Sequence, residues 1–232
     1  VPPITLRATA RAGAPAALAL ASGDGQRGRV GRALGRPVRL KVTDAAGNPV
    51  PGVEVTLEPS AGSLADSSIV TDSTGRASVT WTLGRAPGAH RLAVRAQGVE
   101  RALEVAATAT VGPAANVSFA DAPATGTVGR QLTGALVVQV TDEFGNPVGD
   151  ATVSFSTKSG RVSPTRVVTD AKGEAKTRWV LGTKRGEQSL VVTVRGTEAS
   201  SRLVVDATTA APTVAKPQPA KKKSSGTSAR RS

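Results

Sequence analysis

The sequence contains no cysteine and no tyrosine, and it has a single histidine, His90. The absence of cysteine excludes disulfide bonds, thiolate nucleophiles and cysteine-based metal sites. One histidine leaves few pairs of nucleophile and base, and we expect His90 to be an ordinary surface or loop residue. No apolar run approaches the roughly 20 residues of a membrane-spanning helix. These absences predict a protein that is not an enzyme and that binds no metal or cofactor.

Aromatic residues are also scarce, at 2% of 232 residues, although hydrophobic residues make up 39%. The aromatic set consists of Trp81, Trp179, Phe119, Phe144 and Phe155. The hydrophobic core must therefore be built mainly from Val, Leu, Ala and Ile. The same scarcity argues against a carbohydrate-binding module, which needs an exposed aromatic platform, and against stacking on nucleic-acid bases.

Acidic residues are absent from the end of the chain, although the whole chain has a net charge of +13. Residues 210–232 are rich in Ala, Pro, Lys and Ser, a composition that cannot bury enough apolar surface to fold alone. We expect a disordered basic tail that contacts anionic lipid or an acidic protein surface, with nucleic acid as the less favoured partner. The residues predicted to make this contact are Lys216, Lys221, Lys222, Lys223, Arg230 and Arg231.

The most informative feature that is present is an internal repeat with an offset of 98 residues. Val42–Val50 reads VTDAAGNPV, and Val140–Val148 reads VTDEFGNPV. Trp81–Gly84 (WTLG) and Trp179–Gly182 (WVLG) keep the same offset. About a third of the paired positions are identical without a gap, and a repeat of this length is a whole domain rather than a solenoid unit.

Within each repeat, apolar and polar residues alternate with a period of two. Val38, Leu40 and Val42, for example, alternate with Arg39 and Lys41. Such alternation indicates antiparallel strands that bury one face, and Gly, Pro, Asn and Asp separate the strands. About seven strands per repeat fit an immunoglobulin-like sandwich. We therefore predict an all-β protein with two tandem immunoglobulin-like β-sandwiches at residues 14–111 and 112–209, followed by the tail.

Aspartates recur in the turns of both repeats: Asp44, Asp72, Asp142 and Asp170. A calcium site would need about six to eight converging oxygen ligands. Each of these aspartates is isolated and is followed by a turn glycine, so we interpret them as turn caps rather than metal ligands.

These motifs resemble bacterial immunoglobulin-like domains of the invasin/intimin type. The resemblance rests on VTDxxGNPV and on the later motif TDxxGxA at Thr71–Ala77 and Thr169–Ala175. The second copy departs from it at Ala151, where the first has Val53. The resemblance implies a stalk, spacer or docking surface of a bacterial envelope protein, located in the periplasm or at the cell surface and peripheral to the membrane.

Residues 1–13 precede the first repeat, and the segment around Ile4 and Leu6 resembles the last strand of a repeat at residues 103–108. Three interpretations stay open. The segment is the end of a preceding domain, a free strand that adds to the sheet edge of a partner, or an extension packed on its own first domain. Because the chain opens with Val-Pro-Pro rather than Met, we expect a processed form or a fragment.

Two hypotheses of function follow. The first is a membrane-extrinsic subunit that braces a larger bacterial envelope complex and whose partners are the protein subunits of that complex. A photosynthetic reaction-centre or antenna assembly is the narrower form of this hypothesis. The alternative is a fragment of an invasin-like adhesin or surface stalk. The short linker around Gly112 predicts a fixed arrangement of the two domains under either hypothesis.

Overall fold

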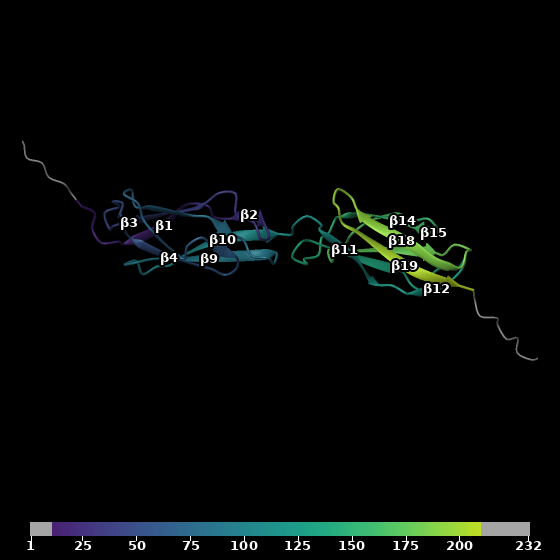
Figure 1. Cartoon of the computed structure of the whole chain (residues 1–232). Coiled ribbons are helices and arrows are strands. Elements are labelled where there is room, and N and C mark those ends of the chain that lie inside the picture. Colours follow the sequence, from purple (N-terminus) through teal and green to yellow (C-terminus); the bar gives the residue numbers. More distant parts are fainter. Residues whose placement is uncertain (1–10, 210–232) are drawn as a thin grey trace, which may run out of the picture.

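A computed structural model describes residues 11–209 as two β-sandwiches that lie end to end (Figure 1). Among these residues there is no helix with the length and hydrophobicity required to cross a bilayer. The predicted partner-binding residues lie outside the described range, so their roles stay predictions: Ile4, Leu6, Lys216, Lys221, Lys222, Lys223, Arg230 and Arg231.

The first sandwich packs a sheet of order β1-β3-β7 against a sheet of order β2-β10-β9-β4-β6, with a small third sheet, β5-β8. Its strands are β1 (Ala17–Ser22), β2 (Gln26–Arg29), β3 (Val38–Thr43), β4 (Glu54–Pro59), β5 (Ser63–Leu64), β6 (Ser68–Val70), β7 (Arg76–Val79), β8 (Trp81–Thr82), β9 (Gly88–Ala96) and β10 (Leu103–Thr110). Burial alternates along β3, β4, β7 and β9, as the sequence alternation predicts. The domain has ten strands rather than the expected seven or so, because short pairings such as β5-β8 also form.

The second sandwich repeats this architecture with sheets of order β11-β13-β17-β15 and β12-β19-β18-β14-β16. Its strands are β11 (Asn116–Asp121), β12 (Thr125–Thr127), β13 (Leu136–Thr141), β14 (Thr152–Thr157), β15 (Arg161–Ser163), β16 (Arg166–Val168), β17 (Glu174–Val180), β18 (Gly186–Val194) and β19 (Ser200–Thr208). The predicted fold of two tandem immunoglobulin-like sandwiches is confirmed, whereas the limits 14–111 and 112–209 stay a prediction.

The first part of each domain contributes strands to both sheets. β1 pairs antiparallel with β3, and β2 then crosses to the other sheet and pairs in parallel with β10. β11 and β12 do the same with β13 and β19. Because one continuous segment is bonded to both layers, the entry of each domain is tied to the strand at its exit.

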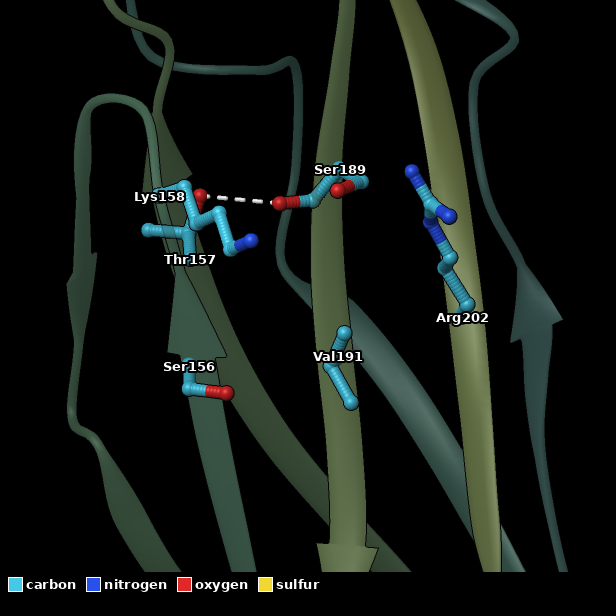
Figure 2. A pocket seen from close by; sticks show the side chains of 6 residues that line it. All are labelled: Ser156, Thr157, Lys158, Ser189, Val191 and Arg202. Atoms are coloured by element: carbon cyan, nitrogen blue, oxygen red, sulfur yellow. Dashed lines mark hydrogen bonds between the residues drawn. The ribbon is translucent and has the colours of Figure 1, made fainter.

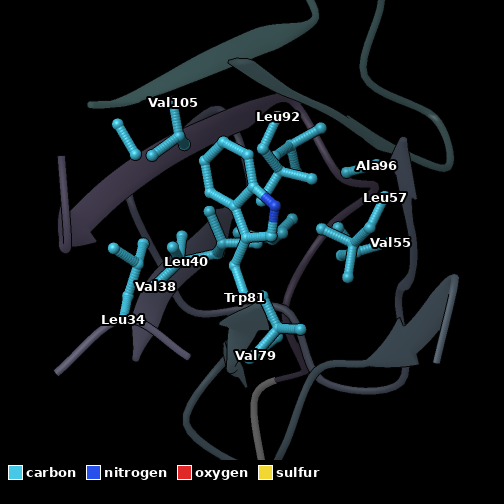
Figure 3. Packing of buried hydrophobic residues seen from close by; sticks show 14 of the residues in the cluster. Leu34, Val38, Leu40, Val55, Leu57, Val79, Trp81, Leu92, Ala96 and Val105 are labelled. Carbon is cyan, nitrogen blue, oxygen red and sulfur yellow. The ribbon is translucent and has the colours of Figure 1, made fainter. Parts of the chain in front are cut away.

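Each domain is built around one tryptophan. The side chain of Trp81 is fully buried between residues of both sheets, among them Val38, Leu40, Leu92 and Val105 (Figure 3). Its indole Nε1 donates a hydrogen bond of 3.1 Å to the carbonyl of Ala61. Trp179 is buried in the same way and donates to the carbonyl of Ser159 at 3.1 Å. The indole N–H thus has the partner that a buried donor requires.

Candidate functional site

The turn that follows β13 contacts the first domain through several side chains. The first residue of this turn, Asp142, is fully buried. Its carboxylate accepts hydrogen bonds from the N–H groups of Phe144 and Asn146, at 2.9 Å each, and from the Asn146 side chain. It also accepts a bond of 3.1 Å from the N–H of Gly112 in the linker. One carboxylate therefore fixes both the shape of the turn and the path of the linker.

The side chain of Phe144 leaves this turn and packs on the end of the first domain. It is half-buried against the core cluster of that domain. Gly31 lies beneath the ring with φ of +66°, and a Cβ at Gly31 would lie 2.6 Å from Phe144 Cε2. We call the surface that receives the ring the inner seat. Its residues line one hollow together with the ring of Phe144: Gly31, Ala61, Gly62, Thr82, Gly84 and Arg85.

Polar contacts surround the ring in the inner seat. The side-chain amide of Asn146 donates a hydrogen bond of 2.8 Å to the backbone carbonyl of Arg85. The guanidinium carbon of Arg85 lies 5.6 Å from the centroid of the Phe144 ring, within the range of a cation–π contact. Arg32 and Glu143 form an ion pair of 3.2 Å, but both side chains are at least half exposed, so its contribution is small. Ring burial and the Asn146 bond therefore account for most of the stability of the joint.

The sequence contained a signal for this joint that the repeat comparison did not use. Within the nine-residue motif the two copies differ at only two positions, where Ala45-Ala46 is replaced by Glu143-Phe144. The side chains at both replaced positions contact the first domain, together with that of Asn146, which both copies of the motif share. A difference confined to the tip of an otherwise identical turn indicates a contact that only one copy makes.

His90 is not the surface or loop residue that the sequence suggested. It lies on β9, is 5% exposed, and its Nδ1 accepts a hydrogen bond of 3.3 Å from the N–H of Gly84. Its Nε2 lies 3.1 Å from the carbonyl of Ala86. Gln188 makes the equivalent bonds in the second domain, to the N–H of Gly182 and to the carbonyl of Lys184. Both side chains are structural. His90 holds the loop at Gly84 beside the inner seat, and Gln188 holds the equivalent loop at Gly182 in the second domain.

A shallow hollow lies on the outward face of the second domain (Figure 2). Lys158 and Arg202 supply two cations there, and Ser156 and Ser189 supply hydroxyl groups. No carboxylate or imidazole lines the hollow, so it offers no acid–base pair for catalysis. The matching hollow of the first domain has acids at the positions equivalent to Ser156 and Arg202, namely Glu58 and Glu104, and one cation, Arg91, which is paired with Glu104.

The recurring aspartates cap turns, as the sequence predicted. Asp72 accepts hydrogen bonds from the N–H groups of Thr74 and Arg76, and Asp170 accepts them from Lys172 and Glu174. Within residues 11–209, no group of three or more His, Cys, Asp or Glu side chains is placed to hold a metal ion.

Asp44 is expected to make the first domain sensitive to acid. The N–H of Gly13 and the side chain of Asn48, followed by the N–H groups of Asn48 and Ala46, lower the pKa of Asp44 to about 2, and burial opposes them only in part. A carboxyl whose folded pKa lies below its unfolded value, about 3.9, stabilises the fold above that value. This contribution is lost as the pH falls from about 4 through about 2.

The check is the thermal midpoint of the wild type and of Asp44→Asn between about pH 7 and pH 2. Asp44→Asn should lower the midpoint at pH 7 and flatten its decrease below about pH 4. Asp66→Asn, at an exposed position of the same domain, is the control and should follow the wild type. An acid profile of Asp44→Asn that runs parallel to the wild type would contradict the role of this carboxylate.

Comparison with known proteins gives a family match over most of the chain. The model of the bacterial Ig-like domain (group 1) matches residues 36–119 and 114–208. No curated protein sequence matches the chain. Among solved structures, the D0-D1 domain of intimin is similar over 83% of this chain and 98% of its own, with 19% identity and a TM-score of 0.35. The adhesin FdeC of Escherichia coli is similar over 83% of this chain and 63% of its own, with 22% identity and a TM-score of 0.46. The adhesin InvE of Yersinia pseudotuberculosis is similar over 82% and 58%, with 18% identity and a TM-score of 0.37.

Proposed function

The chain belongs to the bacterial Ig-like domain (group 1) family, and from this premise we propose that it is a non-catalytic, rigid two-domain spacer in the stalk of a bacterial cell-surface protein. In this role the two sandwiches hold a protein-binding segment at a fixed distance and angle from the cell envelope. The proposal corresponds to the adhesin or stalk hypothesis rather than to the brace.

The observation that carries this proposal is the joint between the domains. A flexible linker would leave the ends of the two sandwiches in water, whereas here Phe144 is packed on the first domain and Asn146 is bonded to its backbone. The linker itself is bonded to Asp142 through Gly112. Tandem domains joined in this way keep a fixed distance and angle between the two ends of the rod, which a spacer requires.

The described residues give no specific support to the brace hypothesis. No observation on residues 11–209 points to a photosynthetic reaction-centre or antenna complex. The two segments that this hypothesis used as contacts, residues 1–13 and 210–232, lie largely or wholly outside the described residues. The features that the structure does describe, a domain-to-domain joint and two regular sandwiches, serve a spacer directly.

Phe144→Ala is expected to loosen the joint without unfolding either domain. Losing a half-buried phenyl ring costs the docked arrangement about 1–1.5 kcal/mol, which shifts the ratio of docked to undocked forms about tenfold. The chain has no cysteine, so spin labels attach only at cysteines introduced at exposed positions such as Ser78 on β7 and Arg178 on β17. We expect a narrow distribution of label distances in the wild type and a clearly broader one in Phe144→Ala.

A matched pair of variants separates the joint from general effects on stability. Gly31→Asn places a side chain where the ring of Phe144 lies, while Asn tolerates the positive φ at this position. Gly129→Asn makes the same substitution at the same φ of +66° in the second domain, where no atom lies within 4 Å of the new Cβ. Gly31→Asn should broaden the distribution and Gly129→Asn should not. A broad distribution in the wild type would overturn the spacer proposal.

A further inference from the structure

The far end of the second domain repeats the three glycines of the inner seat, but its other three residues differ, and Thr183 stands at the position of Arg85, so the cation over the aromatic ring has no counterpart on this surface. We call this surface the outer seat, formed by Gly129, Ser159, Gly160, Val180, Gly182 and Thr183, which are equivalent through the 98-residue repeat to the residues that receive Phe144. Gly31 and Gly129 have the same φ of +66°, and Gly62 and Gly160 have φ of +90° and +83°. The backbone of the two surfaces therefore has nearly the same shape.

Hydrogen bonds hold the two seats in the same way. The N–H of Gly31 donates to the carbonyl of Gly84 at 3.0 Å, and the N–H of Gly129 donates to that of Gly182 at 3.0 Å. Gln188 fastens the loop at Gly182 as His90 fastens the loop at Gly84. The outer seat is thus formed in advance of any contact and does not need a ligand to shape it.

The two seats differ in what covers them. The position of a Cβ at Gly31 overlaps the ring of Phe144, whereas no atom of the described chain lies within 4 Å of the same position at Gly129. The equivalent turn of the first domain, at the other end of the molecule, carries Ala45 and Ala46 and so has no ring to offer to another copy. Among residues 11–209, nothing occupies the outer seat in the way that Phe144 occupies the inner one, so the seat can take a partner that supplies the missing aromatic residue.

The charge around the outer seat selects among such partners. Arg130 is equivalent to Arg32, which pairs with Glu143 in the joint. Two further cations, Arg161 and Lys184, replace the uncharged Ser63 and Ala86 of the inner seat. Within residues 11–209 none of these three cations forms an ion pair. A basic rim around an apolar seat favours a turn that carries both an acidic and an aromatic side chain.

We propose that the outer seat is a docking site for another immunoglobulin-like domain, one that presents an acidic-aromatic-Gly-Asn turn like Glu143–Asn146. The proposal rests on the spacer function above and deepens it, because it names a partner for the end of the second domain that lies away from the joint. It also assigns a role to Ala45 and Ala46. Since the contact joins two different surfaces, an aromatic residue in the first turn would allow copies of the chain to add end to end without closing.

The test is to supply the missing turn. Ala45 and Ala46 are exposed, and the bonds that shape their turn come from the backbone and Asp44, so Ala45→Glu/Ala46→Phe keeps the fold. At a protein concentration near 1 mM, sedimentation equilibrium should give the double variant a mean mass about twice that of the wild type or more. This concentration is chosen because it is about the effective concentration that a short tether gives to two linked domains. Adding Gly129→Asn, which places a side chain in the outer seat, should return the double variant to the wild-type mass.

Two results would overturn this inference: no gain in mass over the full concentration range, or association that survives Gly129→Asn. The label distances of the wild type separate its failure from failure of the spacer proposal. A narrow distribution with no association leaves the spacer standing and removes only the outer seat. A broad distribution in the wild type would contradict both the spacer proposal and the outer seat, because the inner seat would then not hold the turn at Glu143–Asn146.

Discussion

Trp179→Ala is expected to lower the free energy of unfolding of the second domain by about 3–5 kcal/mol, the usual cost of truncating a large buried aromatic side chain. Trp179 has no exposed surface, and its Nε1 is bonded to the carbonyl of Ser159. Truncation leaves a cavity at the centre of the core and removes one of the two donors to that carbonyl, the other being the Thr157 hydroxyl. Since single domains are stable by only about 5–15 kcal/mol, a large part of the stability of this domain would be lost.

The distribution of tryptophan makes this result easy to assign. Each domain contains one tryptophan, so in Trp179→Ala the fluorescence of Trp81 reports on the first domain alone. In a urea titration, circular dichroism should show an early transition of the second domain, while the Trp81 signal keeps its midpoint. Trp81→Ala is the matched variant and should give the reverse pattern. A loss below about 1 kcal/mol would show that the core does not depend on the indole.

Gly62→Ala is the second substitution for which we expect a large effect, a loss of about 2–5 kcal/mol in the first domain. Gly62 has φ of +90°, which costs a residue with a Cβ roughly 1–2 kcal/mol. The new Cβ would also overlap the carbonyl oxygen of Thr82 and lie 2.8 Å from the backbone nitrogen of Gly84. Both contacts are to backbone atoms, which cannot rotate away, so overpacking adds about 1–3 kcal/mol.

Gly47→Ala provides the control for backbone strain without a clash. Gly47 has nearly the same φ, +85°, but no atom lies within 4 Å of a Cβ built there. Its cost should be limited to the conformational part, about 1–2 kcal/mol. Thermal unfolding of the two variants compares them directly. Equal losses in Gly62→Ala and Gly47→Ala would show that the crossing of the chain at Gly62 is looser than the structure indicates.

The two glycines also show how closely folding and the joint are connected. Gly62 belongs to the inner seat, so a displaced backbone at this point would change the surface that Phe144 contacts. We therefore expect Gly62→Ala to affect both stability and the distribution of label distances, whereas Gly47→Ala affects stability alone.

The architecture of this protein could be predicted from its amino-acid sequence. The 98-residue repeat and the alternation of Val and Leu with polar residues predicted two sandwiches and their longer strands, although not the additional short ones. They could do so because the side-chain period of a strand and the chemistry of its turns are local properties of the chain. The turn caps at Asp44 and Asp142 followed from the same local reasoning.

The roles of single residues at the domain ends could not be predicted from the sequence, because they depend on contacts that form only in the folded chain. His90 is buried because the loop at residues 84–86 folds over it. Since the second repeat has Gln188 rather than a histidine at the equivalent position, the sequence did not indicate that both side chains hold this loop. Phe144 occupies an exposed turn of its own domain and becomes half-buried only because the first domain ends beside it. The contacts of the joint connect residues of two different domains, from 59 positions apart for Arg85 and Phe144 to 113 for Gly31 and Phe144, and no period or motif within one domain encodes them.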